Sequence, residues 1–86
     1  MRGDREMVAV LEALARYLRA NPLASDTADS ICRWWLDSDP ARMDGVMQAL
    51  ELMQRQGLVE AVIAADGRLR YRRIGSDAAF DRLIGN

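Results

Sequence analysis

Four of the twelve basic residues in this chain stand within six positions, in the segment GRLRYRRI at 67–74. They are Arg68, Arg70, Arg72 and Arg73, and every basic residue of the chain is an arginine. The planar guanidinium group donates paired hydrogen bonds to phosphate or carboxylate oxygens. This segment therefore predicts a contact with the phosphates of a nucleic acid or with an acidic protein surface.

Other chemistries have few residues to support them. The chain has no histidine and one cysteine, Cys32, so acid–base catalysis near neutral pH, an internal disulfide and a common metal site are not expected. A glycine-rich phosphate loop and a convergent nucleophile and base are not recognisable either. We expect a protein that is not an enzyme and has no cofactor or metal, with Cys32 as a small buried apolar residue.

Positive and negative charges are separated along the sequence, although the net charge of the whole chain is only −1. Residues 21–66 hold three arginines and eight acidic residues, a net charge of −5. Residues 67–86 hold five arginines and two acidic residues, a net charge of +3. A partner that prefers positive charge should therefore approach the C-terminal part of the chain.

Length and composition predict one domain that spans residues 1–86. A chain of 86 residues is near the small end of what folds alone, and 50% of its residues are apolar, which is enough for a core. We find no apolar run of membrane-spanning length and no signal-peptide pattern in residues 1–7. The expectation is a cytoplasmic protein without a membrane contact.

Three amphipathic helices are expected before the arginine-rich segment. In residues 4–20 the apolar side chains recur every three or four positions, as on one face of an α-helix. Residues 25–27 are all good N-caps for a second helix, and Asp39-Pro40 marks the start of a third helix at 40–56. The expected core consists of ten apolar side chains from these helices and from the segment that follows: Leu11, Leu14, Leu18, Ile31, Trp35, Val46, Leu50, Met53, Leu58 and Tyr71.

The second helix carries two adjacent tryptophans with different expected roles. Ile31, Cys32 and Trp35 share one helical face, so Trp35 is expected to fill the space between the three helices. Trp34 lies beside that face and is the candidate for a contact with a partner. The alternative for Trp34 is that it covers the first helix or the C-terminal segment.

Residues 58–74 change from helical periodicity to an alternation of apolar and polar side chains, which is typical of a β-hairpin. Asp66-Gly67 between the two runs predicts a two-residue turn, because a type I′ turn needs positive φ at both central residues. A turn of that length pairs Val62 with Tyr71.

This predicted register gives the hairpin an apolar face and a basic face. Arg68, Arg70 and Arg72 lie on the basic face. Arg73 lies on the apolar side, where Glu60 is opposite to it and is expected to neutralise it. The other residues expected on the apolar side are Val62, Ala64, Leu69 and Tyr71.

A short helix capped by Ser76 or Asp77 is expected at the C-terminal end of the chain. Its apolar residues, Phe80, Leu83 and Ile84, lie on one side. The first helix also has apolar residues on a second face, and this flank is expected to pack under the C-terminal segment; the alternative is a dimer contact. One protomer of this size is not expected to bury both apolar surfaces. We therefore expect a homodimer.

ALELMQRQGLVE at 49–60, followed by ADGRLRYRR at 65–73, resembles the winged helix-turn-helix domains. In many such domains the recognition helix ends in an apolar residue before a Gly-Leu-Val step, and Asp-Gly-Arg forms the hairpin tip. Both patterns occur here, and the resemblance covers residues 4–74. We expect a mainly α fold with a small β-hairpin: a three-helix core, a two-stranded wing and a short C-terminal helix.

The resemblance implies a small transcriptional regulator that binds duplex DNA as a homodimer. Helix 40–56 would enter the major groove, where Arg42, Asp44 and Gln48 are the candidates for reading bases. The wing at 58–74 would contact the DNA backbone through three arginines: Arg68, Arg70 and Arg72.

The charges of the predicted recognition helix favour a protein partner as the alternative to DNA. Arg42 is the only cation near the start of that helix, and a duplex repels carboxylates. The alternative is a winged-helix module for protein–protein interaction, which binds through Trp34 and this acidic surface without nucleic acid. The arginine row has an alternative role as well, the protection of an edge strand from aggregation. The acidic residues of the second and third helices are Asp29, Asp37, Asp39 and Asp44.

Overall fold

The structure is a computed structural model of the chain, and it describes residues 2–37 and 39–85. These residues form a mainly helical domain with four α-helices and a three-stranded antiparallel sheet. In chain order the elements are α1 (Arg2–Ala20), β1 (Ser25–Asp26), α2 (Ala28–Ser30), a π-helix (Ile31–Trp35), a 3₁₀-helix (Pro40–Arg42), α3 (Met43–Arg55), β2 (Val59–Ile63), β3 (Leu69–Arg73) and α4 (Asp77–Ile84).

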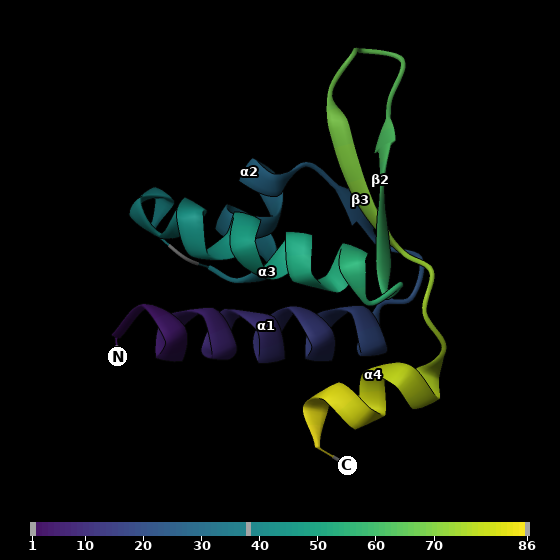
Figure 1. Ribbon diagram of the computed structural model, residues 1–86. Helices are drawn as coiled ribbons and strands as arrows, with labels where there is room; N and C mark the ends of the chain where they lie inside the picture. The colour runs from purple at the N-terminus through teal and green to yellow at the C-terminus, as the bar shows by residue number, and fades with distance from the viewer. Residues whose placement is uncertain (1, 38, 86) are drawn as a thin grey trace.

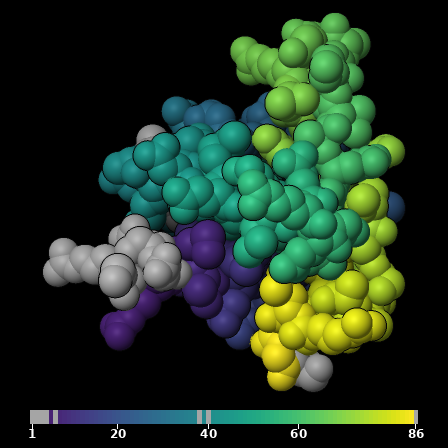
Figure 2. All heavy atoms as spheres, viewed as in Figure 1, coloured from purple at the N-terminus to yellow at the C-terminus, as the bar shows by residue number. Residues whose placement is uncertain are grey.

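α1 is the central helix, because α3 packs against one side of it and α4 against the other (Figure 1). Its predicted apolar face is confirmed, since Leu11, Leu14 and Leu18 are all buried. β2 and β3 form a hairpin that rises beyond the helices, so that its tip protrudes from the body of the domain (Figure 2). The helices therefore hold the base of the hairpin and leave its tip exposed.

The second helix begins as predicted but does not remain α-helical. Oγ1 of Thr27 accepts a hydrogen bond from the N–H of Ser30 at 3.3 Å, so Thr27 is the N-cap of α2. The next five residues form a π-helix, in which the N–H of Leu36 donates to the carbonyl of Ile31 at 3.1 Å. A π-helical turn is wider than an α-helical turn, so the side chains that follow it are rotated from their expected positions.

This widened turn places Trp35 differently from the prediction. Ile31 and Cys32 are fully buried, as expected. Trp35 is half-buried, so its prediction as a main core residue is wrong, whereas the other nine expected core residues are buried. Its indole stacks on the ring of Tyr17 in α1, with the ring centroids 4.6 Å apart. Trp35 therefore covers one end of the core rather than filling its centre.

The third helix begins with a 3₁₀ turn. The carboxylate of Asp39 accepts a hydrogen bond from the N–H of Ala41 at 2.9 Å, which confirms Asp39 as the residue that caps this start. The predicted helix 40–56 is α-helical only over 43–55. Gly57 ends it as expected, with a φ of 72° in the left-handed region.

The loop of the hairpin holds three residues, and the predicted two-residue turn is wrong. The N–H of Ala64 donates to the carbonyl of Arg68 at 2.9 Å, so residues 65–67 form the loop. Gly67 has a φ of 81°. Three-residue hairpin loops commonly consist of a type I turn followed by a residue with positive φ, which is the position of Gly67 here. The Asp66-Gly67 pair is compatible with both loop lengths, so the local sequence does not distinguish them.

The longer loop shifts the register of the hairpin by one residue. Tyr71 lies opposite Ala61, and Leu69 lies opposite Ile63. Because side chains alternate between the two faces, the shift moves Val62 to the basic face, contrary to the prediction. Ala64 is likewise not on the apolar face.

The same shift changes the partner of Glu60. Glu60 lies opposite Arg72 and forms an ion pair with it. The prediction that Glu60 neutralises Arg73 is therefore wrong, although Arg73 does lie on the apolar side.

The predicted two-stranded hairpin is present, and a third strand that was not predicted joins it to form the sheet. β1 pairs antiparallel with β3, and the strand order is β1-β3-β2. A strand of two residues is too short for its alternation to be recognised in a sequence. β1 pairs only with Tyr71 and Arg72, so Arg72 lies in the middle of the sheet, whereas Arg68 and Arg70 lie beyond the end of β1. The protection of an edge strand stays a prediction for these two arginines.

α4 completes the core within one protomer. Oγ of Ser76 accepts a hydrogen bond from the N–H of Ala79 at 3.2 Å, which confirms Ser76 as a cap. Phe80 is fully buried, and Leu83 and Ile84 are partly buried against the same core. The expectation that this surface needs a second protomer is therefore wrong.

Arg73 joins the sheet, α1 and α4 through one guanidinium group, and its side chain is 8% exposed. Nε donates to the carbonyl of Gly75 at 2.8 Å, and Nη1 donates to the carbonyl of Leu18 at 3.2 Å. Nη2 binds the carboxylate of Asp77, and the group lies over the ring of Phe80 at 4.7 Å. Arg73 is therefore a structural residue, although it is adjacent in sequence to the exposed arginines.

Arg19 extends this network along α4. Its Nε donates to the carboxylate of Asp81 at 2.9 Å, and its Nη1 lies 3.5 Å from the carboxylate of Asp77. The hydrogen bond from Arg73, together with the charge of Arg19, lowers the pKa of Asp77 below its ordinary value. The hydrogen bond to Asp81 raises the pKa of Arg19.

We expect Gly75→Ala to lower the free energy of unfolding by about 1–3 kcal/mol, as overpacked sites do. A Cβ at this position would lie 3.1 Å from Cα of Leu58 and 3.3 Å from Cε2 of Phe80. The control is Gly45→Ala, whose Cβ would meet only a methyl group of Val10, at 4.0 Å. Because alanine favours a helix by up to about 1 kcal/mol over glycine, this control should be stabilised. Urea denaturation measures both variants, and a parent-like Gly75→Ala would contradict the close contact.

We expect acid to destabilise the domain through Asp77. Its folded-state pKa is lower than its unfolded-state pKa, so the unfolded chain binds more protons as the pH falls. The stabilisation is complete above the ordinary pKa of an aspartate, about 3.9, and is lost as the pH falls through the folded-state value. Asp77→Asn should therefore be less stable than the parent at pH 7 and should lose less stability between about pH 5 and pH 2. Urea denaturation at a series of pH values measures this difference; identical pH profiles would contradict it.

Candidate functional site

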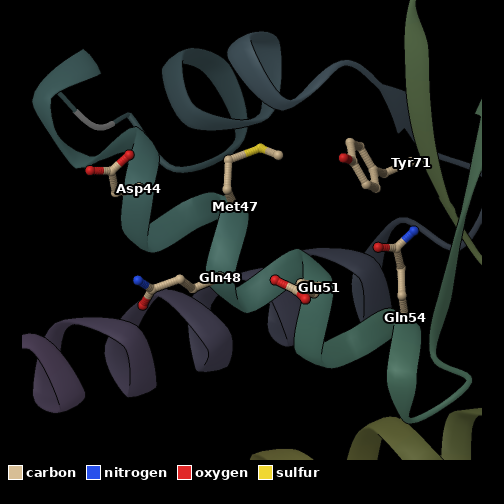
Figure 3. A pocket seen from close by; sticks show the side chains of 6 residues that line it. All are labelled: Asp44, Met47, Gln48, Glu51, Gln54 and Tyr71. Atoms are coloured by element: carbon tan, nitrogen blue, oxygen red, sulfur yellow. The ribbon is translucent and has the colours of Figure 1, made fainter.

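An open groove of about 480 Å³ lies between the outer face of α3 and the hairpin. Figure 3 shows that the side chain of Met47 extends from α3 toward the ring of Tyr71 on β3. A partner in this groove would contact the helix and the hairpin at the same time. The groove is lined by Asp44, Met47, Gln48, Glu51, Gln54 and Tyr71.

Helical periodicity places five of these side chains in the groove. They follow one another along α3 on the face opposite to its apolar stripe, and that stripe is buried in the core. Tyr71 reaches the groove because side chains alternate along β3 and this one points toward the helices. It is 6% exposed, so it closes the groove at the point where the hairpin meets the core.

The groove is acidic. Asp44 and Glu51 are its charged lining residues, and within the described part of the chain no arginine lines it. Nη2 of Arg55 lies 2.7 Å from Oε1 of Glu51, so part of the charge of Glu51 is balanced at the margin of the groove. Asp44 has no ion pair among the described residues. The groove therefore attracts cationic groups and repels phosphates.

Two of the three residues expected to read bases line the groove, namely Asp44 and Gln48. Arg42 lies in the 3₁₀-helix before α3, where it is exposed and outside the groove. The amide of Gln48 can donate to and accept from a base edge, but it can do the same with a peptide group. Arg42, the cation expected among the base-reading residues, therefore lies outside the groove.

Arg70 and Arg72 extend from the face of the sheet opposite to the groove, because they flank Tyr71 in β3. Their side chains are 41% and 58% exposed, as predicted, but both have carboxylate partners. Nη1 of Arg70 lies 3.6 Å from Oδ1 of Asp26, and Arg72 pairs with Glu60. Part of their positive charge is therefore balanced within the chain, and their contact with phosphates stays a prediction.

Arg68 differs from the other two arginines of the row. It is exposed near the tip of the hairpin, and its backbone N–H donates to the carboxylate of Asp66 at 3.0 Å. Among residues 2–37 and 39–85, the guanidinium group of Arg68 has no ion pair. The positive charge that this row can offer to a partner is thus concentrated at the hairpin tip.

The acidic surface expected on the second and third helices is only partly available. Asp29 lies 3.5 Å from Arg33 in an ion pair, and Asp39 caps the 3₁₀ turn. Asp37 is exposed, with a φ of 48° where the chain leaves the π-helix. Trp34 is 77% exposed, as a contact residue should be, but it does not line the groove.

Four residues of the groove were not assigned to a site from the sequence. Tyr71 was expected only in the core, because alternation places it on the apolar side of the hairpin and does not show that it also reaches the outer face of α3. Met47 carries the signal that was available: it stands on the polar face of an amphipathic helix, and it is 42% exposed. The other two are Glu51 and Gln54.

Comparisons with known proteins assign no function to this chain, so its function must be inferred from the geometry of the structure. The described residues contain no cluster of three or more His, Cys, Asp or Glu that could hold a metal ion. None of the helices in 2–37 or 39–85 has the length and apolarity needed to cross a bilayer. No family model, curated protein or solved structure matches the chain.

We expect the two tryptophans to differ in their contribution to stability. Trp35→Ala should lower the free energy of unfolding by about 2 kcal/mol, less than the roughly 3–5 kcal/mol of a fully buried aromatic residue, because Trp35 is half-buried. Trp34→Ala should change it by less than about 0.5 kcal/mol, as exposed substitutions do. Urea denaturation of both variants measures the difference. A larger effect of Trp34→Ala would reverse the assignment of their roles.

Proposed function

We propose that this chain is a winged helix-turn-helix domain that binds a partner protein through the groove between α3 and the hairpin. The observation that carries the proposal is the lining of the groove: two carboxylates, two amides, a methionine and a tyrosine. Such a surface complements a protein segment with cationic and apolar side chains. It is a poor complement to the polyanionic backbone of a duplex.

The order of the elements supports the winged-helix part of this proposal. A short strand precedes the second helix and pairs with the hairpin, and the hairpin directly follows the third helix. In a winged helix-turn-helix domain α3 would be the recognition helix and the hairpin would be the wing. The groove then lies between the two elements that such domains use for recognition.

The arginine row supports a protein partner over DNA. A ligand in the groove faces the side of β3 that carries Tyr71, whereas Arg70 and Arg72 extend from the other side. Both arginines also have carboxylate partners within the chain. They therefore add little attraction for a phosphate backbone beside α3.

Duplex DNA binding by a transcriptional regulator is the second candidate, and it is favoured by Arg42 and Arg68. Both are exposed, and neither has an ion pair in the described part of the chain. Arg42 stands at the start of the third helix and Arg68 near the tip of the wing, where a winged helix would contact bases and phosphates. In this candidate, helix 40–56 and wing 58–74 bind the duplex, and Gln48 reads an adenine.

We expect Asp44→Arg to release a partner protein that the parent binds in cells, because the reversed charge repels a cationic segment from the groove. Partners are cross-linked in the source cells at native abundance and quantified by mass spectrometry. Asp29→Arg makes the same change of charge on α2, outside the groove, and should retain the partner. Release by Asp29→Arg but not by Asp44→Arg would place the contact on α2 and contradict the groove.

Binding to a random-sequence duplex separates the two candidates. We expect no detectable binding by the parent at about 50 mM salt, where non-specific contacts are still strong. Parent binding that weakens steeply with salt, and that is lost when Arg68, Arg70 and Arg72 are all replaced by Ala, would overturn the proposal in favour of DNA. Arg42→Ala or Gln48→Ala should then relax the preference for a sequence.

A further inference from the structure

β2 is an edge strand whose single charged residue, Glu60, is paired with Arg72. It reads Val-Glu-Ala-Val-Ile and pairs with β3 on one side only. Edge strands of natural proteins commonly carry lysine or proline, which disfavour pairing with another chain, and β2 has neither. Val62 and Ile63 are 38% and 71% exposed, so the unpaired edge is also apolar. The arginines of the hairpin lie on β3, where they do not shield this edge.

The register of the hairpin determines which backbone groups point to the free edge. The N–H of Ala64 donates to the carbonyl opposite it at 2.9 Å, so the even-numbered residues of β2 direct their backbone groups toward β3. These directions alternate along an antiparallel strand. The N–H and C=O groups of Ala61 and Ile63 therefore point outward. No backbone hydrogen bond within the described ranges reaches them.

We propose that β2 is a homodimer interface, at which it pairs antiparallel with β2 of a second copy about a twofold axis at Val62. This register places Ala61 opposite Ile63 of the partner subunit, so that the outward groups of both strands form hydrogen bonds. The two hairpins then join into one continuous antiparallel sheet. An isologous contact of this kind is complete with two copies, because the free edge of β2 is then paired in both subunits.

The side chains of this register are complementary to themselves, which favours a second copy over a different strand. Val62 lies opposite its own copy in a non-hydrogen-bonded pair, where β-branched side chains approach closely. A small residue, Ala61, lies opposite the larger Ile63. Glu60 lies opposite Ala64, so the two carboxylates of the dimer do not face each other. The pairing covers the exposed apolar end of β2 without burying an unpaired charge.

The shape of the domain permits this approach. The hairpin rises clear of the helices (Figures 1 and 2), so a second hairpin can lie beside it without meeting α1 or α4. Two short strands bury less than the roughly 1,200 Å² of a standard stable interface. We therefore expect a weak, concentration-dependent dimer.

Sedimentation equilibrium from about 10 µM to 1 mM tests this proposal in the range expected for a small interface. The parent should change from its 9.7 kDa monomer toward twice that mass. Ala61→Pro removes an N–H that points outward and leaves the bonds to β3 intact, so it should weaken association by at least about tenfold. Ile63→Lys adds an edge charge and should have the same effect. Circular dichroism establishes that both variants fold.

The control is Leu69→Lys. Leu69 lies opposite Ile63 on the same face of the hairpin and is 49% exposed, but it belongs to β3 and not to the free edge of β2. This variant should retain most of the association. Equal loss in Leu69→Lys and Ile63→Lys would assign association to the apolar tip and overturn the pairing of strand edges. A parent that stays monomeric at about 1 mM, or association unchanged in folded Ala61→Pro and Ile63→Lys, would also overturn it.

Discussion

The buried guanidinium group of Arg73 connects the sheet to α1 and α4, and the arrangement of the rest of the domain depends on this connection. It binds a carbonyl at the end of α1, the carbonyl of Gly75 and the carboxylate of Asp77. The last carbonyls of a helix have no partner within the helix and carry partial negative charge, so a cation at Leu18 is well placed. Because the guanidinium group is buried, loss of these partners would leave its charge without hydrogen bonds and away from water, which is unfavourable. The position of β3, and with it the shape of the groove, depends on this contact.

Local signals in the sequence predicted the order of the helices and several of the residues that cap them. A helix cap is chemistry between near neighbours, so Thr27, Gly57 and Ser76 act in the structure as their residue types indicate. The hairpin was also predicted, but its register was not. Asp66-Gly67 fits loops of two or three residues, and the choice depends on which side chains the core accepts. A slip of one residue exchanges the faces of a strand, so this single ambiguity misplaced Val62.

Features that depend on distant parts of the chain were not predictable from local patterns. β1 is two residues long and exists only because β3 lies beside it. The π-helix that rotates Trp35 leaves no trace in the apolar pattern of its residues. Phe80 was assigned to an apolar strip left for a second protomer, because no local pattern shows that the guanidinium group of Arg73 lies over its ring. Helix periodicity therefore predicted most of the core and the packing of α1 under the C-terminal segment, but not the full burial of Phe80 within one protomer.

In the candidate site, too, residues placed by local periodicity were predicted and residues placed by long-range contacts were missed. The outward face of α3 follows from helix periodicity, which is why Asp44 and Gln48 were found. Tyr71 was missed as a site residue because its position on the apolar side was interpreted as a place in the core, and its approach to the outer face of α3 is a long-range contact. The charge balance of the arginine row was missed because Asp26, the partner of Arg70, was interpreted only as a cap of the second helix. Alternation was enough to place Arg70 and Arg72 on one face, but it could not show which carboxylates neutralise them.

The two proposed surfaces use different groups of the same hairpin, so they are compatible. Pairing at β2 uses outward backbone groups and the side chains of Val62 and Ile63, whereas the groove uses Tyr71 and the outer face of α3. A dimer formed at β2 would hold two grooves at a fixed separation. A partner with two cationic segments of matching spacing would then bind both at once, and the second contact would form at a high effective concentration. Weak pairing at a strand edge would in this way increase the affinity of an acidic groove whose own contact area is small.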